Sequence, residues 1–519
     1  SCSRPPVSPA PFQGDERSMT ATLVVADHII TGFDADGTPI VYADAAILVQ
    51  GDTIAAIGPA VALRRDHPDA TEVGGRGRVA IPGLINAHHH VGLTPFQAGA
   101  RDQPLELWFP ERLVMRDVDP RLDTLYSAFE MIASGVTTVQ HLHSRAPGDT
   151  EAVLSWADAI LGAYEEIGMR ASYSFAMRDQ NRMIYAADEA FVASLPDDLR
   201  APTAAYLSSF ALPLNDQVDV FRELRARTAQ ASRLAVQIAP ANLHWLSDQA
   251  LESAAQMAEE TGAPLHMHLL ETPYQEEYAR RRTGGSALAY IDRFGLVGPD
   301  LTIGHGVWMC DDDIALLAER GGCLCHNCSS NLRLKSGTVD LNAFLANGIP
   351  IALGIDEAGI NDDRDMLQEM RLALTLHRPP GHDAASPTAA DILRMATEHG
   401  AATTPFKGTV GRLAPGMLAD IVLLDYARIT YPWQDPAIPL VDVLLRRARA
   451  GAVETVMVNG SVIYHEGSFL RLDRDATLEE IAAALARPDT PREAERRRLA
   501  AALLDPVRSF YRGWRSDLV

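Results

Sequence analysis

The sequence Ile81-Pro82-Gly83-Leu84-Ile85-Asn86-Ala87-His88-His89-His90 ends an apolar, β-type run abruptly in three imidazoles. Side chains alternate between the two faces of a strand, so His88 and His90 share one face and His89 lies on the other. Two neutral imidazoles at the carboxyl end of a strand can bind one divalent metal ion if other strands supply further ligands. A surface histidine run or a tag remnant is the alternative, and the apolar residues and the Pro-Gly turn before the histidines disfavour it.

From residue 83 to residue 403 the sequence alternates short apolar segments with longer amphipathic ones. This rhythm is typical of a parallel sheet covered by helices. Eight such units predict an α/β fold, a (β/α)8 TIM barrel that spans residues 83–403. The eight predicted strands begin near Gly83, Thr137, Arg170, Leu234, Pro264, Leu301, Gly322 and Ile349.

The segments on either side of the predicted barrel carry β signals instead. Residues 19–82 contain short strand-like runs with turns between them, and residues 404–470 return to that pattern around the Asn459-Gly460 turn. The simplest arrangement lets the late strands complete the early unit. We therefore expect a small composite β-sandwich domain built from both ends of the chain.

Residues 471–519 are predicted to form a helical tail. Thr477 with Glu480 matches the spacing of a capping box at a helix start, and Thr490-Pro491-Arg492-Glu493 places a proline at the first helical position. The alternating arginines and glutamates of this tail indicate a solvated face or a face that docks onto a neighbouring subunit. A homo-oligomer is our expectation.

The composition limits the partners and the compartment. The 519 residues carry a formal net charge of −22, which argues against polyanionic partners such as nucleic acid or an anionic membrane. Five cysteines in so long a chain do not make a disulfide framework, and no run approaches the length of a membrane span. We expect a cytoplasmic protein with a small-molecule substrate. Residues 1–18, rich in proline and serine, are expected to be a disordered leader or a segment foreign to the protein, with Met19 as a candidate start.

A second strand candidate, Leu265-His266-Met267-His268-Leu269, carries two histidines on one face. His268 is nearer the carboxyl end, where barrel enzymes build their sites, so we assign it rather than His266 to the metal. Glu271 follows just past the strand. A carboxylate at that place can take a proton from a water molecule and return it to a leaving nitrogen.

Two further strand candidates end in polar groups. His305 closes the run Leu301-Thr302-Ile303-Gly304, and Asp356 closes the run Ile351-Ala352-Leu353-Gly354-Ile355. A single aspartate after a strand is usually a helix cap. Four strands that each end in His or Asp at the same end of one predicted barrel argue against coincidence. The constellation predicts a metal site.

Three histidines and one carboxylate leave an open position for water on a zinc ion, or on iron or another divalent ion. Many two-metal barrel hydrolases bridge their ions with a carbamylated lysine on an earlier strand. Lys335 and Lys407 are the only lysines of this chain, so that bridge cannot form and one metal ion per chain is expected.

A cysteine-rich segment resembles a thiolate metal cluster. Alternation along a strand, however, places Cys323 and Cys325 opposite His326, which disfavours a second zinc ion formed by these residues with Cys328. His326 ends a predicted strand, and we expect it to contact the substrate.

The motifs at the predicted strand ends resemble those of the amidohydrolase superfamily, and the resemblance covers roughly residues 20–469. The branch most resembled holds the methylthioadenosine/adenosylhomocysteine deaminases and the chlorohydrolases of triazine breakdown. The motifs are Pro82-Gly83-Leu84-Ile85-Asn86-Ala87-His88, Gly135-Val136-Thr137-Thr138, His268-Leu269-Leu270-Glu271-Thr272, Gly304-His305-Gly306, Asn331, Gly354-Ile355-Asp356 and Gly411-Arg412-Leu413-Ala414-Pro415-Gly416-Met417-Leu418-Ala419-Asp420.

This resemblance implies a role for each matching residue. Glu271 is implied as the proton shuttle, and His305 as the group that orients the attacking water or the substrate. Asp356 is implied to act in catalysis as well as in metal binding. The implied metal ligands are His88, His90, His268 and Asp356.

The segment after the fourth predicted strand departs from the family pattern. Deaminases of this branch usually carry Pro-His-Ala-Pro-Tyr there, and this chain has Ala239-Pro240-Ala241-Asn242-Leu243-His244-Trp245. Trp108, on the loop after the first strand, either walls an apolar pocket or packs in the core. His141 and His143 are pocket residues or satisfied core groups. The candidate substrate contacts are Trp108, His141, His143, His244, His326 and Asn331.

The sequence thus predicts a mononuclear metal hydrolase that cleaves a carbon–nitrogen bond at an sp2 carbon by metal-activated water. Deamination of an N-heterocycle is the preferred reaction, with Glu271 protonating the ring nitrogen and then the departing amine. The alternative is hydrolysis of an acyclic urea, amide or carbamate, as in the phenylurea hydrolases of the same superfamily. A non-catalytic barrel that serves in binding or assembly is a third reading, and the complete set of ligands and Glu271 oppose it.

Overall fold

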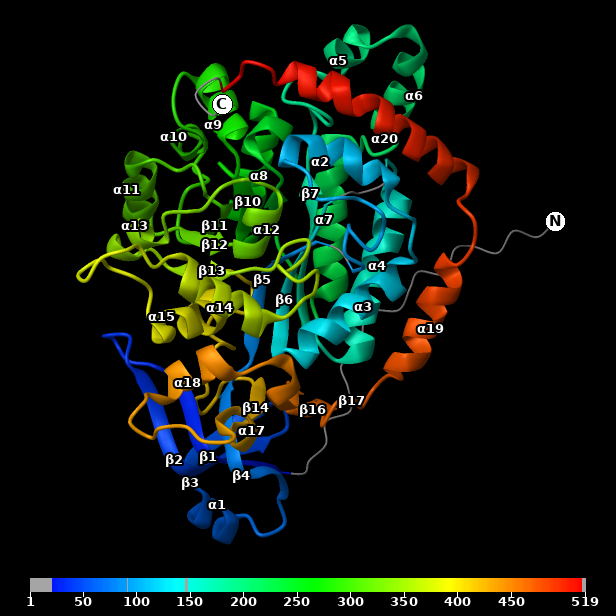
Figure 1. Ribbon diagram of the computed structural model, residues 1–519. Helices are drawn as coiled ribbons and strands as arrows, with labels where there is room; N and C mark the ends of the chain where they lie inside the picture. The colour runs from blue at the N-terminus through cyan, green and yellow to red at the C-terminus, as the bar shows by residue number, and fades with distance from the viewer. Residues whose placement is uncertain (1–20, 91, 145–147, 516–519) are drawn as a thin grey trace, which may run out of the picture.

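The computed structural model describes residues 21–90, 92–144 and 148–515 (Figure 1). The expectations for residues 1–18 and Met19 fall outside these residues. Within the described ranges, no helix combines the length and the apolar character needed to cross a membrane.

Eight parallel strands follow one another around the centre of the molecule. The strands form two sheets. Isolated parallel bridges join these sheets at both edges, from Ile238 to Leu265 and from His89 to Asp356, which gives a barrel-type arrangement. Each predicted strand start lies within two residues of an observed one. The first sheet contains β5 (Leu84–His89), β6 (Val136–His143), β7 (Arg170–Met177) and β8 (Leu234–Val236), and the second contains β10 (Leu265–Leu269), β11 (Leu301–His305), β12 (Cys323–His326) and β13 (Ile351–Leu353).

Helices surround these strands, and their ends have clear sequence causes. For example, the Ser247 side chain accepts a hydrogen bond from Ala250 N at the start of α8 (Asp248–Thr261), and Gly262 ends that helix in the left-handed conformation at φ 63°. The outer layer visible in Figure 1 includes α3 (Pro120–Ala133), α4 (Thr150–Ile167), α7 (Leu214–Thr228), α8, α9 (Pro273–Thr283), α10 (Ala287–Asp292), α11 (Asp311–Arg320), α13 (Leu341–Ala346), α14 (Met366–Leu376) and α15 (Ala389–Arg394).

Strands from both ends of the chain form one composite sheet. The composite nature agrees with the sequence prediction, but the described strands are hydrogen-bonded into a single eight-stranded sheet rather than into two separate ones. Its order is β17 (Ser468–Phe469), β16 (Ser461–His465), β15 (Val453–Val458), β14 (Ile421–Asp425), β4 (Thr71–Pro82), β1 (Ala21–Phe33), β2 (Pro39–Gln50) and β3 (Thr53–Pro59).

Strand β4 links the composite sheet to the barrel, because it runs through Pro82 and Gly83 directly into β5. It pairs in parallel with β1 and antiparallel with β14. The first half of β4 contains Gly74, Gly75 and Gly77, which have positive φ angles and resemble a turn in the sequence. A side chain at Gly74 would place its Cβ 2.4 Å from the Val25 carbonyl oxygen, so the close approach of β1 requires glycine there.

The C-terminal tail packs on its own chain. Helix α20 (Pro491–Phe510) buries Leu499, Leu503 and Val507 in a cluster with residues of α2 (Leu105–Glu111), of the following turn η1 (Arg112–Val114) and of α6 (Asp197–Ser208). Figure 1 shows this helix, in red, crossing the barrel end beside α5 (Asp188–Ser194) and α6. One face of α20 is therefore buried on this chain and is not available to solvent or to a neighbouring subunit.

One of the two predicted helix starts in the tail is confirmed. Pro491 begins α20 as predicted, and the Thr490 and Glu493 side chains form a capping box there. Helix α19 (Arg474–Leu485) begins earlier than predicted, because the Asp473 side chain caps it by accepting from Ala476 N. Thr477 lies within that helix, where its hydroxyl donates to the Asp473 carbonyl oxygen, so the prediction of a cap at Thr477 was wrong.

A buried ion pair ties β7 to the composite sheet. Arg170, the first residue of β7, is fully buried and donates two hydrogen bonds of 2.9 Å to the carboxylate of Asp420, which precedes β14. The same guanidinium donates to the Ser232 carbonyl oxygen and to the Asn459 side-chain oxygen. The pair is thus bidentate, desolvated and supported by further hydrogen bonds.

Candidate active site

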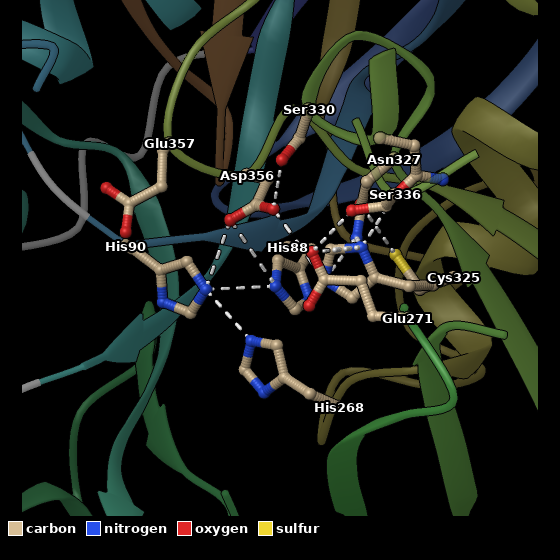
Figure 2. A network of polar contacts seen from close by, with 12 residues as sticks. His88, His90, His268, Glu271, Cys325, Asn327, Ser330, Ser336, Asp356 and Glu357 are labelled. Atoms are coloured by element: carbon tan, nitrogen blue, oxygen red, sulfur yellow. Dashed lines mark hydrogen bonds and ion pairs between the residues drawn. The ribbon is translucent and has the colours of Figure 1, made fainter. Parts of the chain in front are cut away.

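His90 and His268 direct the same ring nitrogen toward each other (Figure 2). His90 Nδ1 donates to the Leu142 carbonyl oxygen, and His268 Nδ1 donates to the Ala241 carbonyl oxygen at 3.0 Å. Because a carbonyl oxygen only accepts, the neutral form of each ring carries its proton on Nδ1 and leaves a lone pair on Nε2. The two Nε2 atoms lie 3.0 Å apart. Two lone pairs that face each other at this distance fit a bound cation.

His88 adds a third nitrogen to this group. Its Nε2 atom lies 3.0 Å from His90 Nε2, and its Nδ1 atom lies 2.8 Å from His266 Nε2. His266 therefore contacts the ring nitrogen of His88 that faces away from His90. His268 lies nearer the carboxyl end of β10 and contacts His90, as the sequence predicts. Burial lowers the pKa of His88 and of His268 well below the usual histidine range, so both rings are held in the neutral form that binds metals.

Asp356 brings a carboxylate to the same place. Its Oδ1 atom lies 3.2 Å from His90 Nε2 and 3.7 Å from His88 Nε2. The backbone at Asp356 has φ 63°, and its N–H donates to the His88 carbonyl oxygen at 2.8 Å, which fixes the turn after β13 against β5. Three imidazole nitrogens and one carboxylate are a donor set that suits zinc and related divalent ions.

Ser330 holds the carboxylate of Asp356 from the other side. Its hydroxyl donates to Asp356 Oδ2 at 2.6 Å from α12 (Cys328–Arg333). Figure 2 shows this contact opposite the histidines. Hydrogen bonds of this kind orient a ligand and tune its basicity.

We expect Ser330→Ala to weaken metal binding about 10- to 100-fold, because partners of metal ligands typically contribute that much. A competition titration with a zinc chelator measures the change. Ser329→Ala is the matched control, since the Ser329 hydroxyl bonds Glu369 and not a candidate ligand. Equal zinc affinity of Ser330→Ala and the wild type would contradict the expectation.

Glu271 lies beside the donor set without belonging to it. Its backbone N–H donates to Gln275 Oε1 at 2.8 Å, and its Oε1 atom accepts from the Ser336 hydroxyl at 3.2 Å. Burial raises the pKa of Glu271 above the usual glutamate value. A carboxylate with a raised pKa is suited to take up a proton and to release it again near neutral pH.

His305 lies between the two carboxylates. Its Nε2 atom is 3.6 Å from Asp356 Oδ2, and its Nδ1 atom is 3.7 Å from Glu271 Oε1. His305 Nδ1 also lies 2.8 Å from Asn331 Oδ1 and donates to it. Asn331 therefore contacts the site through His305, which it orients.

His90, His268 and Asp356 of the donor set form the floor of a pocket with aromatic walls, and His88 is buried beside them. Phe109 and Trp245 lie 5.2 Å apart between ring centroids, and the Arg178 guanidinium stacks over Trp245 at 4.4 Å. The Arg112 guanidinium stacks over Trp108 at 4.6 Å. The pocket lining includes His90, His268, Glu271, His305, Asp356, Leu105, Trp108, Phe109, Arg112, Arg178, Trp245 and Glu357.

Of the predicted substrate contacts, Trp108 lines this pocket. The described residues that line it do not include His141, His143, His244 or His326. The His141 ring bonds the Tyr164 hydroxyl at 2.8 Å on the outer side of β6, and His143 follows on the same face. His244 packs behind Trp245 against Tyr185, at ring distances of 4.3 and 4.0 Å. His326 turns outward to His377, because alternation along β12 points its neighbour Cys325 inward.

The roles of several site residues were not predicted from the sequence. Ser330 and Ser336 follow the end of β12, so their place after a barrel strand was an available signal. Glu357 directly follows Asp356, lines the pocket and lies 3.5 Å from an Arg112 nitrogen. The roles of Gln275 and His266 depend on contacts between segments that no local spacing reveals.

A sequence model of the amidohydrolase family matches residues 79–463. The chain belongs to this family. The predicted resemblance is thereby confirmed, and so is the prediction of an enzyme that acts on carbon–nitrogen bonds. Residues 45–70 of this amidohydrolase also match an imidazolonepropionase-like composite domain of bacteria, in agreement with the composite sheet.

Relatives and solved structures extend the comparison. The amidohydrolase is 29% identical over 469 residues to a 5-methylthioadenosine/S-adenosylhomocysteine deaminase of Pelotomaculum thermopropionicum, covering 89% of this chain and 97% of the relative. Its fold is that of a zinc-bound adenosine deaminase of Xanthomonas campestris, with a TM-score of 0.76, 24% identity and coverage of 93% and 99% of the two chains. An atrazine chlorohydrolase of Arthrobacter aurescens in complex with zinc gives a TM-score of 0.77 at 23% identity, with coverage of 89% and 99%.

Proposed function

We propose that this amidohydrolase is a mononuclear metal-dependent aminohydrolase that removes ammonia from an amino-substituted N-heterocycle. The ion, most simply zinc, would be held by His88, His90, His268 and Asp356. The observation that carries the proposal is the convergence of three imidazole nitrogens and one carboxylate beside Glu271, with all but His88 lining one pocket. The zinc in the two structural neighbours supports the choice of metal.

A bound divalent ion supplies a Lewis acid that lowers the pKa of water toward neutrality. Glu271 would accept one proton from the attacking water and pass it to the ring nitrogen. It would then carry the second proton of that water, from the added hydroxyl, to the amine, which departs as ammonia. His305, oriented by Asn331, would hold the attacking water or the substrate between the two carboxylates. Asp356 remains an anion beside His90 and would accept a hydrogen bond from the same water.

The pocket walls support a planar aromatic substrate. Trp108, Phe109 and Trp245 offer apolar ring faces next to the donor set. A heterocycle that stacks on such faces can present its exocyclic amine to the floor. The relative named as a methylthioadenosine and adenosylhomocysteine deaminase indicates a nucleoside-like substrate class.

One observation favours a second candidate, hydrolysis of an acyclic aryl urea, amide or carbamate. The segment that carries a substrate-contacting histidine in the resembled deaminases contributes Ala241, Asn242 and Trp245 to this pocket, and His244 lies behind them. An apolar wall at this position suits an aryl group as well as a purine.

Release of products from a substrate panel separates the two candidates. The panel contains amino-heterocycles, including adenine nucleosides, together with aryl ureas and amides, and the enzyme is loaded with zinc and analysed for metal content. Ammonia from a heterocycle would support the aminohydrolase. Aniline or alkylamine from ureas, without ammonia, would replace it by the second candidate. An enzyme with about one catalytic zinc ion and no turnover of either class would contradict both.

A further inference from the structure

A second group of metal-binding side chains lies outside the pocket. His326, Cys328 and His377, here called the outer triad, hold their donor atoms within 4.8 Å of one another. His326 Nε2 lies 2.8 Å from His377 Nε2 and 2.7 Å from Cys328 Sγ, and the third separation is 3.9 Å. All three residues are buried, with His377 the most accessible at 6% exposure.

The outer triad joins one barrel strand and two helices. His326 ends β12, Cys328 begins α12, and His377 follows the end of α14. Cys325 points the opposite way and clusters with Ala87 and Ala352 inside the barrel. The triad is therefore separated from the pocket by the wall of the barrel, and its ligands are distinct from those of the candidate active site.

Hydrogen bonding alone does not satisfy this arrangement. A ring nitrogen carries either one proton or one lone pair, yet His326 Nε2 meets both His377 Nε2 and the Cys328 sulfur. If His326 Nε2 forms a full hydrogen bond with one of these two partners, the other partner is left with an incomplete bond in a buried place. A single cation bound by all three ligand atoms would satisfy them together.

The protonation states suit such a cation. Burial lowers the pKa of His326 well below the usual range and that of His377 to about 4, so both rings are neutral at pH 7. Burial also raises the pKa of the Cys328 thiol. A bound metal ion reverses that effect, because coordination removes the thiol proton.

We propose that the outer triad binds a second metal ion, Zn²⁺ or Cu⁺, through His326 Nε2, His377 Nε2 and Cys328 Sγ. Two imidazoles and one thiolate form a borderline-soft donor set, which both ions accept. The absence of a lysine bridge, which led us to expect one metal per chain, concerns a paired catalytic site and does not bear on an isolated one. Cys323 and Cys325 face the side of β12 opposite to His326 and take no part in this site, and His377 supplies a ligand in their place.

The proposed ion would act as a clamp on the active site. Helix α12 carries Ser330 and Asn331, which contact Asp356 and His305. An ion on the outer triad would fix the first turn of this helix to the end of α14. The role is structural, so its loss should lower stability and should affect the pocket only through the position of α12.

Cobalt substitution tests the proposal directly. A thiolate bound to Co²⁺ gives an intense near-ultraviolet charge-transfer band, and none of the candidate catalytic ligands is a cysteine. The 519-residue protein is produced in cobalt-supplemented medium and analysed for metal content and absorption. We expect two ions per chain and the band in the wild type. Cys328→Ser and, independently, the more accessible His377→Gln should each lose one ion and the band.

Cys325→Ser is the matched control. Cys325 also lies near histidines, within a group formed with His88 and His266, but on the inner side of the barrel. It should keep both ions and the band. The proposal is overturned if the wild type binds one ion and shows no thiolate band, or if Cys325→Ser removes the band and Cys328→Ser does not.

Discussion

Glu271→Gln is expected to lower kcat about 10²- to 10⁴-fold while the protein keeps its catalytic metal ion, because a positioned general acid–base contributes that much to a rate. Glutamine preserves the shape of the side chain and the hydrogen bond that Oε1 accepts from the Ser336 hydroxyl. The bond to Gln275 comes from the backbone N–H and is unaffected. It cannot accept a proton from water. Steady-state kinetics on the best substrate of the panel, together with metal analysis of the same preparation, measures both quantities.

Glu276→Gln provides the matched control for this prediction. It makes the same change five residues further on, at a half-exposed carboxylate that pairs with Arg515 outside the pocket. Its kcat should stay near that of the wild type. A Glu271→Gln enzyme that retained its metal and turned over within a few-fold of the wild type would remove Glu271 from the chemistry. Loss of the metal together with the activity would instead assign Glu271 to ion binding.

Asp420→Ala is expected to reduce the free energy of unfolding by about 3–5 kcal/mol, the usual cost of leaving one partner of a buried ion pair uncompensated. The substitution leaves the guanidinium of Arg170 without its bidentate carboxylate at a fully buried position. Urea denaturation followed by tryptophan fluorescence measures the difference. The double variant Arg170→Met/Asp420→Ala should recover part of the loss, because it removes the unpaired charge.

Glu166→Ala is the control with the same geometry and a different environment. Glu166 receives two hydrogen bonds from Arg121 in a bidentate pair, but both side chains are more than one third exposed. Its removal should cost at most about 1 kcal/mol, as for other exposed ion pairs. If Asp420→Ala costs no more than Glu166→Ala, the buried pair does not hold the composite sheet to the barrel.

The strand positions of the barrel could be predicted from the sequence because short apolar runs alternate with amphipathic segments, and four of these runs end in or just before a histidine or an aspartate. The same feature brought His88, His90, His268, Asp356 and Glu271 together, since the carboxyl ends of parallel strands meet at one end of a barrel. The composite sheet was harder. Strand β4 contains three glycines that imitate a turn, and only its close contact with β1 explains them.

The side chains around the donor set were less predictable. A histidine at the end of a strand points into the pocket or into the helical layer, and a shift of one residue decides which. His326 follows the inward-facing Cys325 and therefore points outward. His377 lies 49 residues after Cys328, so no spacing within the cysteine-rich segment could connect it to the outer triad.

During synthesis on the ribosome, one half of the composite sheet is complete long before the other. Strand β4 ends at Pro82 and its partner β14 begins at Ile421, a separation of 339 residues. At about 5–20 residues per second, that partner is made roughly 17–70 s later. Val79, Ala80 and Ile81 are fully or almost fully buried in the finished sheet, and until then they form an unpaired apolar edge. Nascent chains of this protein are accordingly expected to need a chaperone at this edge for most of their synthesis.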